Sequence, residues 1–336
     1  MKFGIAFDPL EMNQRLWRRP TPQEFFALAL ALCAAGLFAW MQPNLPFAGV
    51  DLKIYLEASR GTFQYQGLYY YYGYWILPIF AVLSKFPFFL AYFLWSSINI
   101  IGIFFAERVF GGKALVAVAS YQLFYNLIYG NISGLIVGGL ALCWYGLVNK
   151  KWALAGLGIA LASAKYQIGL TGSLLLILTA PILWKDRLRV FIIPAVIWIL
   201  SLFVYPGWPL EVFHTIQNHP PDALGSISLW RWLGPWSLLF FFPPLLLNRE
   251  SPQRFIAFVA AIGLGLPYFQ QVDLLFLLVM PIGWIGLLGN LGYLMGFYRW
   301  TALQFLFLLP LAVYIWALIS SLVKRPRPSQ PLQGNP

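Results

Sequence analysis

Charged side chains are scarce in this chain, so the few that interrupt its apolar segments are the first candidates for chemistry. The 336 residues include 22 Lys and Arg but only 11 Asp and Glu. The stretch DLKIYLEASRGTFQYQGLYYYYG, residues 51–73, opens with an aspartate and ends in a run of tyrosines. A carboxylate such as that of Asp51 can act as a general base that takes a proton from a hydroxyl group. It can equally be the N-cap of a helix, and both interpretations stay open.

The segment DLKIYLEAS has the pattern of a short amphipathic helix. Lys53 and Glu57 lie four residues apart, which predicts an ion pair on the face toward water. Leu52, Tyr55 and Leu56 form the opposite, apolar face. The helix would place Asp51 at its start, close to the end of a preceding apolar segment.

Lys165 is the only charged residue between Trp152 and Trp184. The segment from Trp152 to this lysine reaches only about 20 Å as a helix, so the lysine would lie short of a membrane surface. At that depth an ammonium costs about 2.5–3.5 kcal/mol unless it snorkels or meets an anion or a wet cavity. The sequence therefore offers two interpretations of Lys165: snorkelling to the headgroups, or binding a lipid-linked phosphate.

A second polar stretch, GWPLEVFHTIQNHPPDALGSISLW, covers residues 207–230 and contains Glu211, His214, His219 and Asp222. The two histidines are five residues apart and do not share a helix face as a zinc pair requires. We predict no metal site. The stretch is either a solvent-exposed loop or a source of substrate contacts.

The elements that carry these residues are membrane helices. The chain is 60% hydrophobic and 10% charged, and its apolar runs of about 20 residues each match a hydrocarbon core of roughly 30 Å. We predict an all-α polytopic membrane protein of about 10–12 transmembrane helices. The expected spans are 25–41, 88–107, 114–129, 131–148, 152–164, 166–184, 190–206, 231–247, 254–269, 273–291 and 301–322.

The distribution of charge predicts the topology. The formal charge of +11 comes from small basic clusters between apolar runs, which excludes a nucleic-acid surface and indicates cytoplasmic connections. With the N-terminus and the C-terminal Lys324 on that side, the number of spans must be even, so we expect 273–299, rich in glycine, to be broken or re-entrant. Residues 76–86 are too short to span and are expected to lie at the outer surface.

One membrane domain accounts for almost the whole chain. We expect a cytoplasmic segment at 1–22, a single transmembrane domain at 23–323 with outer loops at 42–87 and 207–230, and a disordered cytoplasmic tail at 324–336. The expected location is the plasma membrane, with membrane lipids as constant partners.

The order of several motifs resembles the polyprenol-phosphate-mannose-dependent α-1,2-mannosyltransferases, glycosyltransferase family 87 of the GT-C superfamily, over roughly residues 45–185. The resemblance rests on Asp51-x-x-x-Tyr55, Leu68-Tyr69, Pro78, Trp95-x-x-x-Asn99, Gly130-Asn131, AGLGIALASAK ending at Lys165, and Asp273 at the start of a late apolar run. The chain departs from the family where Trp75-Ile-Leu-Pro78 replaces Tyr-Pro-Pro and where Gly130-Asn131-Ile-Ser replaces Gly-Gln-x-Asn. These departures affect the assignment of the sugar and the acceptor more than the assignment to the superfamily.

The resemblance implies a GT-C-like bundle with a juxtamembrane helix at the outer surface after the first span. It also implies transfer of a sugar, mannose or another hexose or pentose, from a polyprenyl-phosphate donor to a lipid or glycan acceptor outside the cytoplasm. No cofactor follows from it, and metal dependence varies across the superfamily. Asp51 matches the catalytic base and Lys165 the ligand of the donor phosphate, with Arg231 and Arg60 as weaker candidates. The candidate substrate contacts are Tyr55, Tyr69, Asn131, His214, His219 and Asp273.

Two other classes of function stay open at this stage. A lipid-linked sugar flippase or transporter would also need a central cation and broken helices, but it should show internal repeats and an acid near the midplane, and neither is evident. A non-catalytic membrane subunit would tolerate the loss of Asp51, whereas an enzyme would not.

Overall fold

The computed structural model describes residues 8–45, 47–60, 70–180, 182–218, 226–248, 251–298 and 300–323. These residues form helices and connecting turns, and their only β-type pairing is an isolated bridge between Ser226 and Gln270. The predicted all-α class is confirmed.

Four helical segments in the described part of the chain are long and apolar enough to cross a membrane. They are Pro22–Asn44 (α2 and η1), Phe88–Phe110 (α5), Trp184–Val204 (α11 and α12) and Ala302–Val323 (the end of η8 and α19). A fifth forms if α7 and α8, bent by 116° at a short break, count as one span. These segments confirm a polytopic membrane fold, while several other predicted spans are shorter helices.

The bounds of the helices show where the expected spans are interrupted. The α-helices are α1 (Pro9–Trp17), α2 (Pro22–Met41), α3 (Val50–Arg60), α4 (Leu77–Leu83), α5 (Phe88–Phe110), α6 (Ala114–Val118), α7 (Tyr121–Tyr129), α8 (Ser133–Val148), α9 (Trp152–Ala162), α10 (Thr171–Thr179), α11 (Trp184–Val190), α12 (Ile192–Val204), α13 (Trp208–Asn218), α14 (Trp230–Leu233), α15 (Phe242–Leu245), α16 (Pro252–Gly265), α17 (Leu275–Leu278), α18 (Leu291–Tyr298) and α19 (Leu308–Val323). The remaining helical segments of the described residues are one π-helix, η3 (Tyr166–Leu170), and six 3₁₀-helices. The 3₁₀-helices are η1 (Gln42–Asn44), η2 (Tyr74–Ile76), η5 (Gly234–Phe241), η6 (Gln271–Leu274), η7 (Gly283–Asn290) and η8 (Trp300–Phe307).

Proline and glycine explain the main differences from the prediction. The range 231–247 was expected to be one helix, but it consists of α14, η5 and α15, because Gly234 with Pro235 and the pair Pro243-Pro244 interrupt the α-helical pattern. Within the expected segment 273–299, the described residues up to 298 form short pieces from η6 to α18, as expected for a broken segment.

The centre of the bundle is held by close packing of α8 on α9. Glycines at the contact let the two backbones approach: a Cβ atom on Gly158 would lie 2.3 Å from the backbone nitrogen of Cys143. Small residues at such contacts are typical of helix pairs in membranes, where packing rather than exclusion of water holds helices together. Helix α8 is buried along nearly its whole length.

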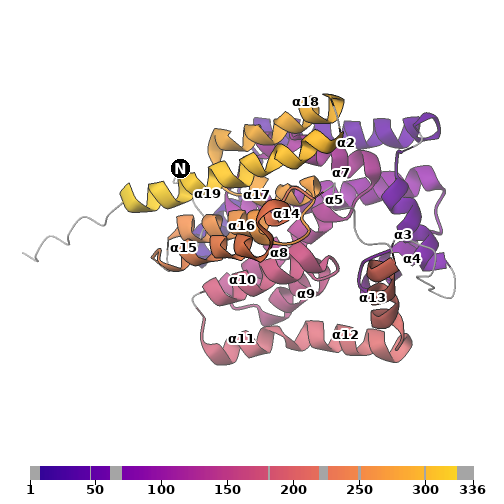
Figure 1. Cartoon of the computed structure of the whole chain (residues 1–336). Coiled ribbons are helices and arrows are strands. Elements are labelled where there is room, and N and C mark those ends of the chain that lie inside the picture. The colour runs from indigo at the N-terminus through magenta and orange to yellow at the C-terminus, as the bar shows by residue number, and fades with distance from the viewer. Residues whose placement is uncertain are drawn as a thin grey trace, which may run out of the picture.

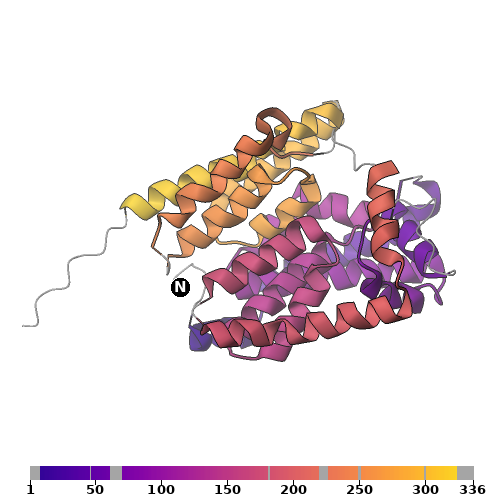
Figure 2. The same cartoon turned by 60° about the horizontal axis from the view of Figure 1, so that its bottom comes forward.

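Several short helices gather at one end of this bundle. Figure 1 shows α3, α4 and α13 together at that end, and α15, the start of α11 and the end of α19 at the opposite end. The ring of Trp75 in η2 lies 5.4 Å from that of Trp208 in α13, so the turn that directly follows the first polar stretch contacts the second stretch there. Figure 2 shows the C-terminal helices as a layer beside the central helices, with α12 along the edge opposite this layer.

Candidate functional site

Helix α3 carries Asp51 on its first turn. It begins at Val50, and its apolar face is buried as predicted, with Leu52 0%, Tyr55 2% and Leu56 3% exposed. Asp51 itself is partly buried, and its Oδ2 accepts a hydrogen bond of 2.7 Å from Nδ2 of Asn131. The carboxylate thus binds a side chain from a distant part of the chain.

The predicted ion pair between Lys53 and Glu57 on α3 does not form. The ammonium of Lys53 instead lies over the ring of Phe88, 5.3 Å from its centroid, while Glu57 is exposed. An exposed pair of this kind contributes little, so a neighbouring aromatic face can compete for the lysine.

The sharp turn between α7 and α8 brings Asn131 to Asp51. Gly130 ends α7 with φ of +68°, and a Cβ atom there would lie 2.9 Å from Cβ of Leu52, so both the backbone conformation and the close approach of α3 favour glycine. The next residue, Asn131, is buried, and its Oδ1 accepts hydrogen bonds from Ser133, 3.0 Å from the backbone nitrogen and 2.8 Å from Oγ.

Lys165 lies at the turn after α9, just before the π-helical turn η3. The residue is only 3% exposed, so its ammonium does not snorkel to solvent. Its Nζ donates to Oδ1 of Asp273 at 2.6 Å, to Oε1 of Gln270 at 3.3 Å and to Oγ of Ser133 at 3.4 Å. A lysine has three donors, and here each has a protein acceptor.

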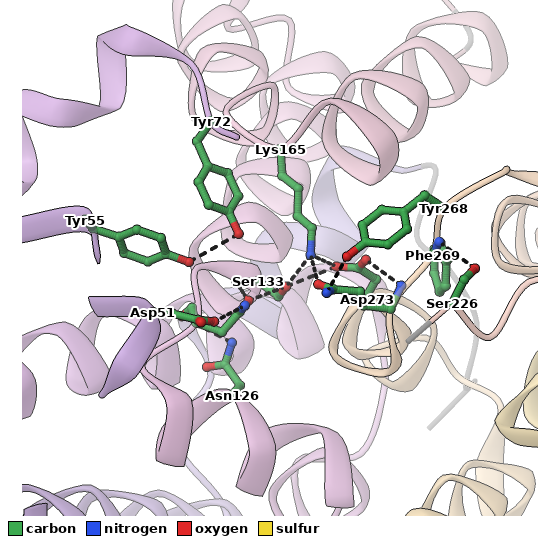
Figure 3. Close-up of polar contacts among 12 residues, drawn as sticks. Asp51, Tyr55, Tyr72, Asn126, Ser133, Lys165, Ser226, Tyr268, Phe269 and Asp273 are labelled. Atoms are coloured by element: carbon green, nitrogen blue, oxygen red, sulfur yellow. Dashed lines mark hydrogen bonds and ion pairs between the residues drawn. The ribbon is translucent and has the colours of Figure 1, made fainter. Parts of the chain in front are cut away.

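Asp273 is the counter-ion of this buried lysine. Its side chain is inaccessible, and besides Lys165 it accepts a hydrogen bond of 3.1 Å from the backbone N–H of Gln270. Oγ of Ser133 lies 3.1 Å from Oδ1 of Asp273, and its single proton is shared between this oxygen and Oδ1 of Asn131. Figure 3 shows Lys165 reaching down between Ser133 and Asp273, with Asp51 on the far side of Ser133. A continuous polar network therefore links Asp51 to Asp273 through Asn131 and Ser133.

A cavity of about 180 Å³ opens over this network. Its walls combine charged, amide and phenol groups with one aliphatic side chain, Ile54. The lining residues are Asp51, Ile54, Tyr55, Tyr71, Tyr72, Tyr125, Asn131, Lys165, Gln167, Tyr268 and Gln270. Neither Ser133 nor Asp273 borders the cavity; both support Lys165 from behind.

The environment of Asp51 makes it a weaker acid than usual. Burial raises the pKa of its carboxyl to about 6, although the hydrogen bond from Asn131 and the positive charge of Lys165 both lower it. A carboxylate with a pKa near neutrality is suited to accept a proton and release it again. Perturbed groups in a cavity are typical of functional sites.

Tyrosines form the wall opposite the network. The hydroxyl groups of Tyr55 and Tyr72 lie 3.2 Å apart (Figure 3), and the ring of Tyr55 packs against Tyr70, Phe80 and Trp95. Burial raises the pKa of Tyr55 and of Tyr72 well above the ordinary value, so both phenols stay neutral. Such amphipathic rings present an apolar face together with hydroxyl groups.

Sequence reasoning missed several members of this site. Ser133, Gln167, Tyr268 and Gln270 were not candidates, because isolated polar residues near helix ends have no distinctive spacing. The run of tyrosines was evident in the sequence, but nothing in it distinguished Tyr72 from its neighbours as a member of the site.

Three predicted site residues lie away from the cavity. Arg231 is exposed and binds Oε1 of Gln304 at 2.8 Å. Arg60, at the exposed end of α3, lies 3.4 Å from the carbonyl oxygen of Ser84, and His214 is exposed on α13. Tyr69 and His219 fall outside the described residues.

Comparison with known proteins assigns the chain to a family. Residues 70–269, more than half of the chain, match glycosyltransferase family 87, a family of GT-C-type enzymes. The matched region includes Tyr72, Asn131 and Lys165, while Asp51 lies 19 residues before it and Asp273 four residues after it. No curated protein and no solved structure matches the chain. With its apolar helices and this match, the chain is a multi-pass membrane glycosyltransferase that belongs to glycosyltransferase family 87.

Proposed function

We propose that this protein transfers one sugar from a polyprenyl-phosphate donor to a lipid or glycan acceptor on the extracytoplasmic side of the plasma membrane. Asp51 is the general base and Lys165 the residue beside the donor phosphate. The observation that carries the proposal is the shared cavity, in which a carboxylate with a pKa of about 6 lies near a buried ammonium. Its volume of about 180 Å³ suits a single sugar unit rather than an extended glycan.

The chemistry is a substitution at the anomeric carbon. The acceptor oxygen forms a bond to this carbon while the bond from the carbon to the phosphate oxygen breaks, and the leaving phosphate keeps the electron pair. The proton of the acceptor hydroxyl passes to Asp51. Base assistance of this kind typically accelerates a reaction by 10²–10⁴-fold.

Lys165 stabilises the leaving group. The donor phosphodiester has one negative charge, and the released phosphate monoester gains a second. A cation already fixed at the site favours this increase in charge without reorganising. Asp273 and Ser133 hold the ammonium from behind, whereas Gln270 borders the cavity at 3.3 Å. The phosphate therefore replaces Gln270 as the third partner of Lys165.

The arrangement of the bundle supports the proposed side of the membrane. Helix α3, which carries Asp51, and helix α13 lie at one end of the bundle, and the basic helix α11 begins at the opposite end (Figure 1). Basic connections favour the cytoplasm, which leaves the cavity facing outward. Mannose, the sugar of the donors used by similar enzymes, is our first choice of substrate.

Sugar transfer by the reconstituted protein tests this proposal. The wild type and Lys165→Met are supplied with radiolabelled polyprenyl-phosphate sugars, or with nucleotide sugars, and a pool of lipid and glycan acceptors. We expect transfer from a polyprenyl-phosphate sugar, with a donor KM at least about tenfold higher in Lys165→Met and an unchanged acceptor KM. Transfer from nucleotide sugars alone, or an unchanged donor KM in the variant, would contradict the proposal.

A further inference from the structure

The amide of Asn131 can take only one orientation. Its Oδ1 lies 3.0 Å from the backbone nitrogen of Ser133, and a backbone N–H is always a donor. The oxygen must therefore face Ser133, which leaves the NH₂ group facing Asp51, 2.7 Å from Oδ2. The usual ambiguity between the two ends of an amide is resolved here by the main chain.

This fixed amide determines which carboxylate oxygen of Asp51 can accept a proton from a substrate. Oδ2 is occupied by Asn131, while no hydrogen bond reaches Oδ1 from any residue in the described part of the chain. Asp51 lines the cavity, so Oδ1 is the oxygen free to accept a proton there. The turn at Gly130 and the burial of Asn131 keep the amide from moving aside.

The same contact favours the ionised form of Asp51. A hydrogen bond donated to a carboxylate stabilises its charge, as does a nearby cation, and Asn131 and Lys165 supply these two effects against the opposing effect of burial. The other titratable groups that interact electrostatically with Asp51 are phenols on which its charge acts, and they are neutral near pH 7. They are Tyr55, Tyr72, Tyr125 and Tyr129.

We propose that Asn131 is a positioning residue, which aims Oδ1 of Asp51 at the acceptor hydroxyl and keeps this carboxylate ionised in the resting site. This role differs from the substrate contact expected from the sequence, and it rests on the proposed function of Asp51 as the base. Without the amide, Asp51 would hold its proton to a higher pH and would turn more freely.

The pH dependence of kcat/KM, which reports the ionisation of the free enzyme, tests this role, with polyprenyl-phosphate mannose as the donor and a lipid extract as the acceptor pool. On the acidic side of the pH–activity profile, activity is lost with a midpoint near pH 6 in the wild type. We expect the midpoint of this acidic limb to lie roughly one pH unit higher in Asn131→Ala. Relative to its own plateau, this variant would then be about fivefold less active than the wild type at pH 6 and equal to it above pH 8. Its KM values for donor and acceptor should stay within about twofold.

Two further variants make the test decisive. Ser133→Ala keeps the backbone N–H that orients Asn131, so its limb should move by much less. Asn131→Asp, nearly identical in shape, places a second carboxylate beside Asp51, and its limb should move further than that of Asn131→Ala because like charges disfavour ionisation.

The outcomes separate this inference from the function on which it rests. If the limb stays in place in both Asn131 variants, or if they change KM alone, Asn131 is a structural residue or a substrate contact and the inference is wrong. If Asp51→Asn transfers sugar at the rate of the wild type, the proposed base itself is wrong.

Discussion

Loss of the charge at Asp273 should be among the most destabilising single changes in this protein. Nζ of Lys165 lies 2.6 Å from Oδ1 of Asp273, and the two side chains are 4% and 0% exposed. Asp273→Asn removes the charge but leaves the ammonium buried, with only neutral acceptors. Removing one partner of a buried pair typically costs about 3–5 kcal/mol, because an uncompensated charge remains.

A surface pair in the same chain provides the matched control. Arg189 and Asp186 form an ion pair of similar length, 2.9 Å, but the arginine side chain is 56% exposed. Asp186→Asn should therefore cost no more than about 1 kcal/mol. Denaturant titration of the detergent-solubilised protein, followed by tryptophan fluorescence, measures both changes in the free energy of unfolding.

A double variant shows whether the cost comes from the unpaired charge. Lys165→Met combined with Asp273→Leu removes both ions, and we expect it to recover most of the stability lost in Asp273→Asn. If Asp273→Asn costs no more than Asp186→Asn, or if the double variant is no more stable than the single one, the buried pair does not hold the site as described.

Three other predictions concern the turn, the tyrosine wall and the base. Gly130→Ala should lower the free energy of unfolding by at least about 1–2 kcal/mol, because its φ is +68°. Gly207→Ala should not, because a Cβ atom there would make only an ordinary contact of 3.9 Å with the ring of Tyr205; the same titration compares them. Tyr72→Phe should lower kcat/KM about two- to tenfold in the transfer assay, because the hydroxyl partner of Tyr55 is lost, and an unchanged value would remove this hydroxyl from the site. Because burial raises the pKa of Asp51 to about 6 from an ordinary 3.8, its charge at pH 7 opposes folding, and Asp51→Asn should be more stable than the wild type by up to about 3 kcal/mol. That gain should shrink as the pH falls from 6 to 4 and Asp51 becomes protonated, so an equal gain at both ends would contradict the assigned cause.

The class of the fold could be predicted from the sequence because it depends on composition. Apolar runs of membrane length can be recognised without knowing how the helices pack, and the helix after the first span follows from the spacing of Leu52, Tyr55 and Leu56. The interruption of 231–247 was missed, since hydropathy weighs proline and glycine only as residues and not as breaks in a hydrogen-bond ladder.

The site was only partly predictable, for a different reason. Lys165 stands out as the only charged residue between Trp152 and Trp184, and Asp51 as the acid that opens a polar stretch between apolar segments. Their partners Asn131 and Asp273 were candidates as substrate contacts, but contacts 80 and 108 residues apart in sequence leave no local pattern. Arg231 was a candidate because of its charge alone, and the structure places it at an exposed contact with Gln304.

The most direct test of the account is a single-turnover comparison of the wild type, Asp51→Asn and Glu57→Gln with a bound polyprenyl-phosphate sugar. Both acids lie on α3, but Glu57 is exposed and takes no part in the cavity, so its variant controls for the loss of one charge from this helix. We predict that transfer falls at least about a hundredfold in Asp51→Asn and stays within about twofold of the wild type in Glu57→Gln. Transfer by folded Asp51→Asn at the wild-type rate would contradict the assignment of Asp51 as the base.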